Sequence, residues 1–306
     1  MRYDEYAFDV PKEKHIRVIV DTDAKNEADD QFAIVQALLS PRFENVGYIA
    51  AHFGDRVPDS MTRSYEELRR IFSLMQFPAE DLVLHGAPHA LPDGQTPVES
   101  EGAQRIIEEA MKEDDRPLYV LFLGPLTDMA SARLVEPRIA DRCTAIWIGG
   151  GPYPTGGPEF NLGNDITAAN VVFGSRLPVW QVPKNVYEMM AVSLSELELN
   201  VYPHGAIGRY LLEQLDAHAH EEGPRKSSFR NGETWILGDN PAVGLLLYEH
   251  RFCFDWIQAP LITRDMTYSV NSLNRPIRVY REVDSHLILN DLYAKLALFI
   301  RKHPEL

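Results

Sequence analysis

Five carboxylate side chains fall within ten residues near the N-terminal end of the chain, in the segment DTDAKNEADD. They are Asp21, Asp23, Glu27, Asp29 and Asp30. So many negative charges in so short a segment repel one another unless a positive charge lies among them. Solvation, or a helix N-terminus that favours acids, would account for one or two of them but not for five. Because carboxylate oxygens are the ligands that Ca²⁺ and Mg²⁺ prefer, the segment predicts a site for a hard divalent cation.

The elements around this segment predict where the cluster lies in the fold. An apolar, β-branched run over residues 16–20 (IRVIV) precedes it and predicts a buried strand. A helical pattern over residues 28–40 follows it. In open α/β sheets, ligands bind beyond the carboxyl ends of the strands. The cluster therefore stands where an active site is expected.

The same alternation of short apolar runs and helical patterns continues along the chain, which predicts βαβ units. The fold class that we expect is α/β, with an open, mostly parallel, doubly wound sheet and helices on both faces, in one domain over residues 1–306. The expected strands are 16–20, 46–51, 82–84, 118–123, 145–148 and 179–182, with late strands at 267–270 and 277–283. The expected helices are 28–40, 60–75, 101–113, 128–134, 166–174, 203–218, 241–250 and 289–302.

Composition excludes several classes of protein. The chain has 45 acidic and 30 basic residues and a formal net charge of −15, which disfavours a nucleic acid partner and favours a cation or a neutral small molecule. Two cysteines, Cys143 and Cys253, are too few for a disulfide framework and indicate a reducing compartment. No apolar run approaches the ~18 residues of a membrane span, and residues 1–15 lack the apolar core of a secretory signal. We expect a cytoplasmic protein that does not contact a membrane.

Two classes of enzyme place an Asp-x-Asp motif after a first strand. In the first, the haloacid-dehalogenase-like phosphatases, Asp21 would be a nucleophile and Asp23 an acid/base, with Mg²⁺ as cofactor. Thr127 and Lys184 would supply the other parts of that site. The late acidic pair that this class needs is missing, because Asp239 stands alone in the segment GDN. The phosphatase is therefore the weaker interpretation.

The second class fits more of the chain. The segment resembles the signature of the nucleoside hydrolase family, which opens with Asp-x-Asp and closes with Asp-Asp at the first strand–helix junction. Three further segments resemble the family in the same order: VLFLGPLTDMASARLVEPRI its Gly-x-Leu-Thr-Asn element, AIWIGGGPYPTGGPEFN its triple-glycine turn with Glu-Phe-Asn, and WILGDNPAVGLLL its late His-Asp-Pro element. Together the segments extend over residues 17–247. One segment alone would be weak evidence, whereas four in order identify the chain as a divergent member.

This resemblance implies a calcium-dependent hydrolase that cleaves the N-glycosidic bond of ribonucleosides or related N-ribosides. By position, Asp23 matches the residue that binds Ca²⁺ and accepts a proton from the attacking water. Asp30, Asp239 and the backbone carbonyl of Thr127 match further calcium ligands, and Asp21 matches the first residue of the motif, which supports the site. Cleavage passes through an oxocarbenium-like transition state, which nearby negative charge stabilises.

The resemblance also implies a set of substrate-binding residues. Asp29, Glu159 and Asn161 match residues that hold ribose hydroxyls, and Asp55 stands where the family commonly has an asparagine that contacts ribose. Each of the first three has a structural alternative: Asp29 as a helix cap, Glu159 as a surface acid and Asn161 in a turn. The implied partners are a small nucleoside or N-riboside and further copies of the same chain, in a homodimer or tetramer. A non-catalytic nucleoside- or sugar-binding protein remains an alternative, which the presence of Asp23 disfavours.

The sequence departs from the family pattern in two places. Five residues, 24–28, separate the Asp-x-Asp from the Asp-Asp where the family has three, and they add Glu27 as a possible ligand or substrate contact. Gly238 stands where some members have a histidine that protonates the departing base. His85 or His89, in the loop after the third expected strand, could replace it.

Aromatic stacking on the departing base is another way to activate it. The candidates are Trp235, Phe229 and Tyr187, although core packing is the more common role for each. Residues 221–234 form the most polar segment of the chain and predict either a mobile lid or a solvated connection.

Overall fold

The central sheet has eight strands in the order β3-β2-β1-β4-β5-β6-β12-β9. The structure is a computed structural model that describes residues 1–306 except 56, 221–231 and 249–251. Neighbouring strands are parallel throughout, except that β9 pairs antiparallel with β12 at one edge. The strands are β1 (Ile16–Thr22), β2 (Phe43–Ala50), β3 (Val83–His85), β4 (Leu118–Phe122), β5 (Cys143–Ile148), β6 (Val179–Val182), β9 (Phe254–Gln258) and β12 (Pro276–Tyr280). The predicted fold class is confirmed.

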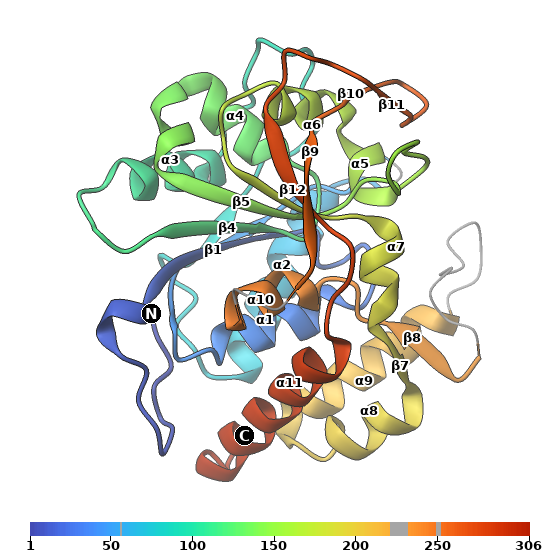
Figure 1. The fold of residues 1–306 in the computed structure, drawn as a ribbon. Helices are drawn as coiled ribbons and strands as arrows, with labels where there is room; N and C mark the ends of the chain where they lie inside the picture. Colours follow the sequence, from blue (N-terminus) through green and yellow to red (C-terminus); the bar gives the residue numbers. More distant parts are fainter. Residues whose placement is uncertain (56, 221–231, 249–251) are drawn as a thin grey trace.

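Helices cover both faces of this sheet. In Figure 1 the helices α3, α4 and α6 lie on one side of the strands, and α1, α10 and α11 lie on the other. The helices are α1 (Asp30–Leu38), α2 (Ser60–Leu74), α3 (Glu101–Met111), α4 (Thr127–Val135), α5 (Phe160–Asn164), α6 (Ile166–Phe173), α7 (Lys184–Tyr187), α8 (Leu194–Asn200), α9 (Gly205–His220), α10 (Asn240–Leu247) and α11 (Ser285–Lys302). Short elements complete the chain: 3₁₀ helices at Lys12–Lys14, Pro137–Asp141 and Glu188–Met190, a hairpin of β7 (Ala191–Ser193) with β8 (Thr234–Ile236), and a hairpin of β10 (Leu261–Ile262) with β11 (Tyr268–Ser269).

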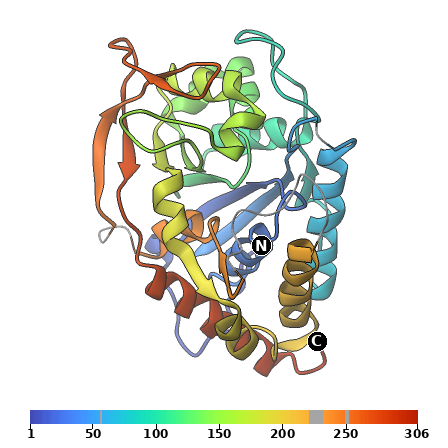
Figure 2. The ribbon, with the colours of Figure 1, turned by 90° about the vertical axis from the view of Figure 1, so that its right-hand side faces the viewer.

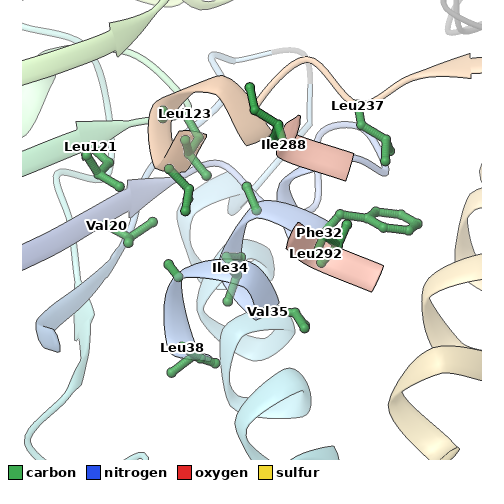
Figure 3. Close-up of a cluster of buried hydrophobic side chains, with 14 of the residues drawn as sticks. Val20, Phe32, Ile34, Val35, Leu38, Leu121, Leu123, Leu237, Ile288 and Leu292 are labelled. Atoms are coloured by element: carbon green, nitrogen blue, oxygen red, sulfur yellow. The ribbon is translucent and has the colours of Figure 1, made fainter. Parts of the chain in front are cut away.

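The alternation of side chains along the strands divides the apolar interior into two cores. Val18 and Val20 of β1 pack with the helices on the side of α1, whereas Ile19 packs on the side of α3 and α4. Figure 3 shows part of the first core, where side chains of β1 and α1 meet Ile288 and Leu292 of α11. Because both faces of β1 are buried, apolar residues follow one another at positions 18–20 instead of alternating with polar ones, as the sequence pattern predicted.

Most of the predicted elements are present, with ends that shift by a few residues. The edge strand β9 was not predicted, because its sequence FDWIQ is largely exposed and lacks an apolar run. It lies beside β12 at the rim of the molecule (Figure 2). Within the described residues, no helix combines the length and the apolar character needed to span a bilayer.

The strand order places a topological switch point beside the acidic cluster. From β1 the chain proceeds to β2 and β3 on one side, and then crosses to β4 on the other side of β1. A crevice opens at the carboxyl ends of strands where the order reverses in this way. The residues that follow β1 and β4 therefore face a common space.

Candidate active site

A small cavity of about 30 Å³ lies at the carboxyl ends of the central strands. Its walls come from five parts of the chain: the loop after β1, the residue after β4, the end of β5 with the segment that leads into α5, the end of α7, and the residues before α10. We name it the inner cavity, and its lining is Asp23, Asn26, Glu27, Asp29, Asp30, Leu123, Ile148, Glu159, Phe160, Asn161, Tyr187, Gly238 and Asp239. The structure thus brings together eight of the candidates that the sequence offered: Asp23, Glu27, Asp29, Asp30, Glu159, Asn161, Tyr187 and Asp239.

Three of these carboxylates converge most closely. Asp29, Asp30 and Asp239 are buried, and each offers an oxygen atom within 4.8 Å of the others. Asp29 and Asp239 occupy the N-cap positions of α1 and α10, which pack against each other, and Asp30 is the first residue of α1. Two helix N-termini therefore point at this space, and their partial positive charge favours the anions gathered there.

The helix termini compensate the negative charge only in part. Burial, followed by the charge of Asp29, raises the pKa of Asp30 to about 8. Burial also raises the pKa of Asp29 to about 6, although backbone N–H groups, among them that of Gly238 at 2.9 Å, favour its ionised form. Burial and the charges of neighbouring acids raise the pKa values of Asp23 and Asp239 well above their ordinary range.

These acids fit a divalent cation. No lysine, arginine or histidine is among the described residues that line the inner cavity. The Oδ2 atom of Asp23 is buried and has no hydrogen-bond partner, which is costly for a carboxylate unless a cation replaces the lost water. An all-oxygen set of donors is typical of Ca²⁺ or Mg²⁺ sites.

Close packing holds the Asp23 side chain in place. Gly124, two residues beyond the end of β4, lies so near that a Cβ atom at this position would be 3.0 Å from the Asp23 Cγ atom. A side chain there would push the carboxylate into the cavity. Glycine at 124 is therefore required by the approach of the β4 loop to Asp23.

Asp21 lies behind the inner cavity and does not line it. It is fully buried, and neither of its carboxylate oxygens has a hydrogen-bond partner. Strand alternation directs Asp21 to the face of Ile19, toward α4, where the charge of Asp128 adds to burial in raising the Asp21 pKa. A nucleophile must reach its substrate, so this position does not suit the phosphatase interpretation.

Asp128 is a buried acid that the sequence reasoning missed. It accepts hydrogen bonds from the Ser100 hydroxyl and from the backbone N–H of Ala87, and burial raises its pKa to about 6. The signal was present in the segment GPLTD, because the similar family segment ends in asparagine.

Thr127 and Asp55 also lie outside the inner cavity. The Thr127 hydroxyl donates to Asp165 at 2.8 Å and lies 2.9 Å from Nε2 of His52, so its side chain belongs to a buried network that sequence reasoning missed. Burial lowers the pKa of His52 to about 4, so this ring is neutral near pH 7. Asp55 is exposed and lines a second, wider cleft instead.

Glu159 and Asn161 both line the inner cavity and stabilise its wall. Glu159 caps α5, and its carboxylate accepts the backbone N–H groups of Asn161 and Leu162 as well as that of Gly150. The Asn161 amide donates to the carbonyls of Leu123, at 2.6 Å, and Ile148, at 2.9 Å. It therefore ties the ends of β4 and β5 together. The two residues are not a surface acid and a simple turn residue, as the structural alternatives proposed.

The inner cavity borders a second cleft of about 510 Å³, which we name the outer cleft. Its lining is Glu27, Gly54, Asp55, Pro158, Glu159, Phe160, Gly163, Asn164, Lys184, Tyr187 and Met266. Four of these residues, Glu27, Glu159, Phe160 and Tyr187, line both spaces. A molecule held in the inner cavity can therefore extend into the outer cleft.

The ring of Tyr187 packs on the backbone where a late histidine would project. A Cβ atom at Gly238 would lie 3.1 Å from Cδ2 of Tyr187 and 3.3 Å from Oδ2 of Asp29. The Tyr187 hydroxyl donates to Glu159 at 3.1 Å, and burial followed by the Glu159 charge raises the Tyr187 pKa far above its ordinary value. The absence of a side chain at Gly238 therefore allows the Tyr187 ring to pack this closely.

The other candidates for activating the leaving group lie elsewhere. His85 stacks on Tyr65 with ring centroids 3.9 Å apart and contacts Glu101, and His89 contacts the carbonyl of Ala90. Neither lines the inner cavity or the outer cleft. Trp235 is fully buried in the core, whereas Phe229 and most of the polar segment 221–234 lie outside the described residues.

With this geometry established, comparison with known families identifies the class of protein. A family model described as inosine-uridine preferring nucleoside hydrolase matches residues 18–287. The chain therefore belongs to this family.

Individual relatives are distant. The chain is similar to a pyrimidine-specific ribonucleoside hydrolase from Salmonella schwarzengrund, with 25% identity over 202 aligned residues, which cover 59% of this chain and 64% of that protein. The purine-preferring ribonucleoside hydrolase from Gardnerella vaginalis has a similar structure, with a TM-score of 0.76 and 20% identity over 92% of this chain and 98% of the other. A plant nucleoside hydrolase gives a TM-score of 0.72 at 18% identity, over 92% and 99% of the two chains. These structures show a shared fold.

Proposed function

We propose that this protein is a calcium-dependent hydrolase that cleaves the N-glycosidic bond of ribonucleosides or related N-ribosides. The observation that carries the proposal is the convergence of Asp23, Asp29, Asp30 and Asp239 on one buried cavity without a basic residue in its described lining. Family membership supports the reaction class, and the names of the relatives support ribonucleosides as substrates.

In this proposal Asp23, Asp30 and Asp239 hold Ca²⁺ at the inner cavity. The backbone carbonyl of Thr127 is the remaining protein ligand. Asp21 does not bind the cation and supports the site from the adjacent end of β1. When bound, the cation would lower the pKa of a water molecule and orient the ribose hydroxyls. Asp23 accepts the proton of the attacking water, for which the buried Oδ2 atom without a partner is suited.

The residues on the opposite wall hold the sugar. Asp29 and Asn161 line the inner cavity, and Glu159 lines both it and the outer cleft. They orient ribose so that its anomeric carbon faces the water, while the base extends outward past Phe160. Asp55, an exposed residue that lines the outer cleft, contacts the substrate there. Orientation of this kind lowers the barrier because the reactants no longer lose rotational freedom in the transition state.

Release of ribose from a panel of nucleosides, measured as reducing sugar with and without EDTA, tests the proposal. We expect activity that EDTA abolishes and Ca²⁺ restores. Asp23→Asn should lower kcat by about 10²–10⁴-fold, which is the usual contribution of a general base. Asp265→Asn, which removes an equal charge from an exposed position, is the matched control and should retain activity.

Two other results would refute the assignment. Near wild-type turnover in Asp23→Asn would exclude Asp23 as the base. Nucleoside binding by calorimetry without any ribose release would instead favour the non-catalytic binding protein.

We also propose a cytoplasmic homo-oligomer. Both cysteines are free, which is consistent with a reducing compartment. The region around β9 and β11 exposes Trp256, Val270 and Leu273, and the last two are more than 90% accessible. Large exposed apolar side chains favour contact with another chain when they form a patch. Light scattering coupled to gel filtration would give the oligomeric mass.

A further inference from the structure

The departing base needs a proton or a positive charge, and the position where some family members carry a histidine has none. Gly238 has no side chain, and the ring of Tyr187 fills the adjacent space. The Tyr187 hydroxyl already donates to Glu159, and its raised pKa means that it does not release its proton near neutral pH. A different residue must face the base.

We propose that Lys184 is the catalytic residue that donates a proton to the departing base. This inference rests on the proposed function, because it assigns a role within the same site. Lys184 is the one lysine, arginine or histidine among the described residues that line the outer cleft. It lies partly buried at the start of α7, directly after the carboxyl end of β6.

The local structure keeps this ammonium group available. The Lys184 backbone N–H donates to the carbonyl of Gly150 at 2.9 Å, which anchors the residue beside the Gly-rich turn after β5. Its Nζ atom has no ion-pair or hydrogen-bond partner within the described part of the chain. In a molecule with a net charge of −15, a partly buried lysine without a partner carboxylate is unusual, and it leaves all three N–H donors free for a ligand.

Acidic residues line the same cleft as Lys184. Glu27 from the loop after β1, Asp55 from the loop after β2 and Glu159 from the segment before α5 line this cleft together with Lys184, and Tyr187 follows on α7. In the proposed step Lys184 acts as an acid through the N–H donors of its ammonium group.

The step balances as follows. The C1′–N bond breaks and its electron pair remains on the base, while an Nζ proton moves to an acceptor atom of the base. The oxygen of the attacking water bonds to C1′, and the proton of that water moves to Asp23. Lys184 then regains a proton from solvent, which reaches it through the outer cleft. The products are neutral base and ribose, with both residues returned to their initial states once Asp23 releases its proton.

The test compares substrates that differ in how much they need an acid. Inosine and uridine have poor leaving groups, whereas p-nitrophenyl riboside releases a stable anion without protonation. We expect Lys184→Gln to lower kcat/KM for the nucleosides by at least about 10²-fold and to change p-nitrophenyl riboside cleavage by less than about 3-fold. Lys184→Arg should be nearly as slow on nucleosides, because a guanidinium keeps the charge but does not deliver a proton. Lys112→Ala, an exposed lysine at the end of α3, is the control and should resemble the wild type on both substrates.

The outcomes separate this inference from the proposed function. Wild-type protein that cleaves none of the three substrates would overturn the proposed function itself. Wild-type cleavage of nucleosides together with equal slowing of all substrates in Lys184→Gln, or with no slowing, would overturn only the role of Lys184. Full nucleoside activity in Lys184→Arg would likewise overturn proton donation, because the charge alone would then suffice. A pH profile of kcat/KM for inosine that loses its alkaline limb in Lys184→Gln would support it.

Discussion

Without a divalent cation, the folded protein should lose stability as the pH rises from 5 to 8. Burial and the charge of Asp29 raise the pKa of Asp30 to about 8 in the folded, metal-free state. The pKa of an unfolded aspartate is about 4, so across this interval the folded state holds a proton that the unfolded state has lost. Stability is then greatest at low pH and declines toward the folded pKa.

The size of this loss of stability can be calculated from the one proton by which the folded and unfolded states differ. A difference of one bound proton changes the free energy of unfolding by about 1.4 kcal/mol per pH unit, or about 4 kcal/mol between pH 5 and pH 8. For a chain of 306 residues, whose entropy of unfolding is near 0.6 kcal/mol/K, this corresponds to a fall in Tm of roughly 6 °C. The pKa values of the neighbouring acids Asp23 and Asp239 are also raised, so their ionisation should make the fall in Tm larger than this value.

The assay is thermal unfolding in EDTA and in saturating Ca²⁺ across this pH range. Calcium binds the ionised carboxylates of the folded state only, so it should raise Tm most at high pH and flatten or reverse the slope. Asp30→Asn should reduce the slope in EDTA, whereas the exposed Asp265→Asn should not. Equal slopes in EDTA and in Ca²⁺, or an unchanged slope in Asp30→Asn, would refute the argument that these carboxylates form the cation site.

Two further predictions concern residues around the site. Burial raises the pKa of Asp128 in the folded state to about 6, so the ionised carboxylate destabilises the fold at pH 7. Asp128→Asn removes this charge and should raise the free energy of unfolding at pH 7 by about 1–3 kcal/mol. Urea titration with calcium chelated measures the change. If Asp128→Asn were less stable than the wild type, the argument that the Asp128 charge destabilises the fold would be wrong. Gly238→Ala places a methyl group 3.1 Å from the Tyr187 ring and should destabilise the protein by about 1–3 kcal/mol and slow ribose release. Gly94→Ala, where the nearest atom is 3.8 Å away, is its control, and equal effects of the two substitutions would show that the ring contact does not matter.

The local part of this site could be predicted from the sequence. The apolar run of β1, the acids that follow it and the start of α1 are contiguous, so Asp29 and Asp30 reach the carboxyl edge of the sheet whatever the rest of the chain does. Alternation of strands and helices then implied a parallel sheet, because only a crossover can return the chain to a parallel neighbour. The late Asp239 was also predicted, although its segment is far from the first cluster in the chain, because a resemblance of four ordered segments connected the two.

Only the tertiary structure decided which side chains form the walls. Asp21 and Asp23 are two residues apart, yet Asp21 belongs to the strand and faces α4, whereas Asp23 lies beyond its end and lines the inner cavity. The ring that covers Gly238 and the lysine of the outer cleft come from α7, more than fifty residues earlier in the chain. A sequence pattern reports local periodicity, but such contacts depend on how loops of distant segments pack once the strands have aligned. For that reason the carboxylates of the inner cavity were predictable as a group, and the surroundings of the leaving base were not.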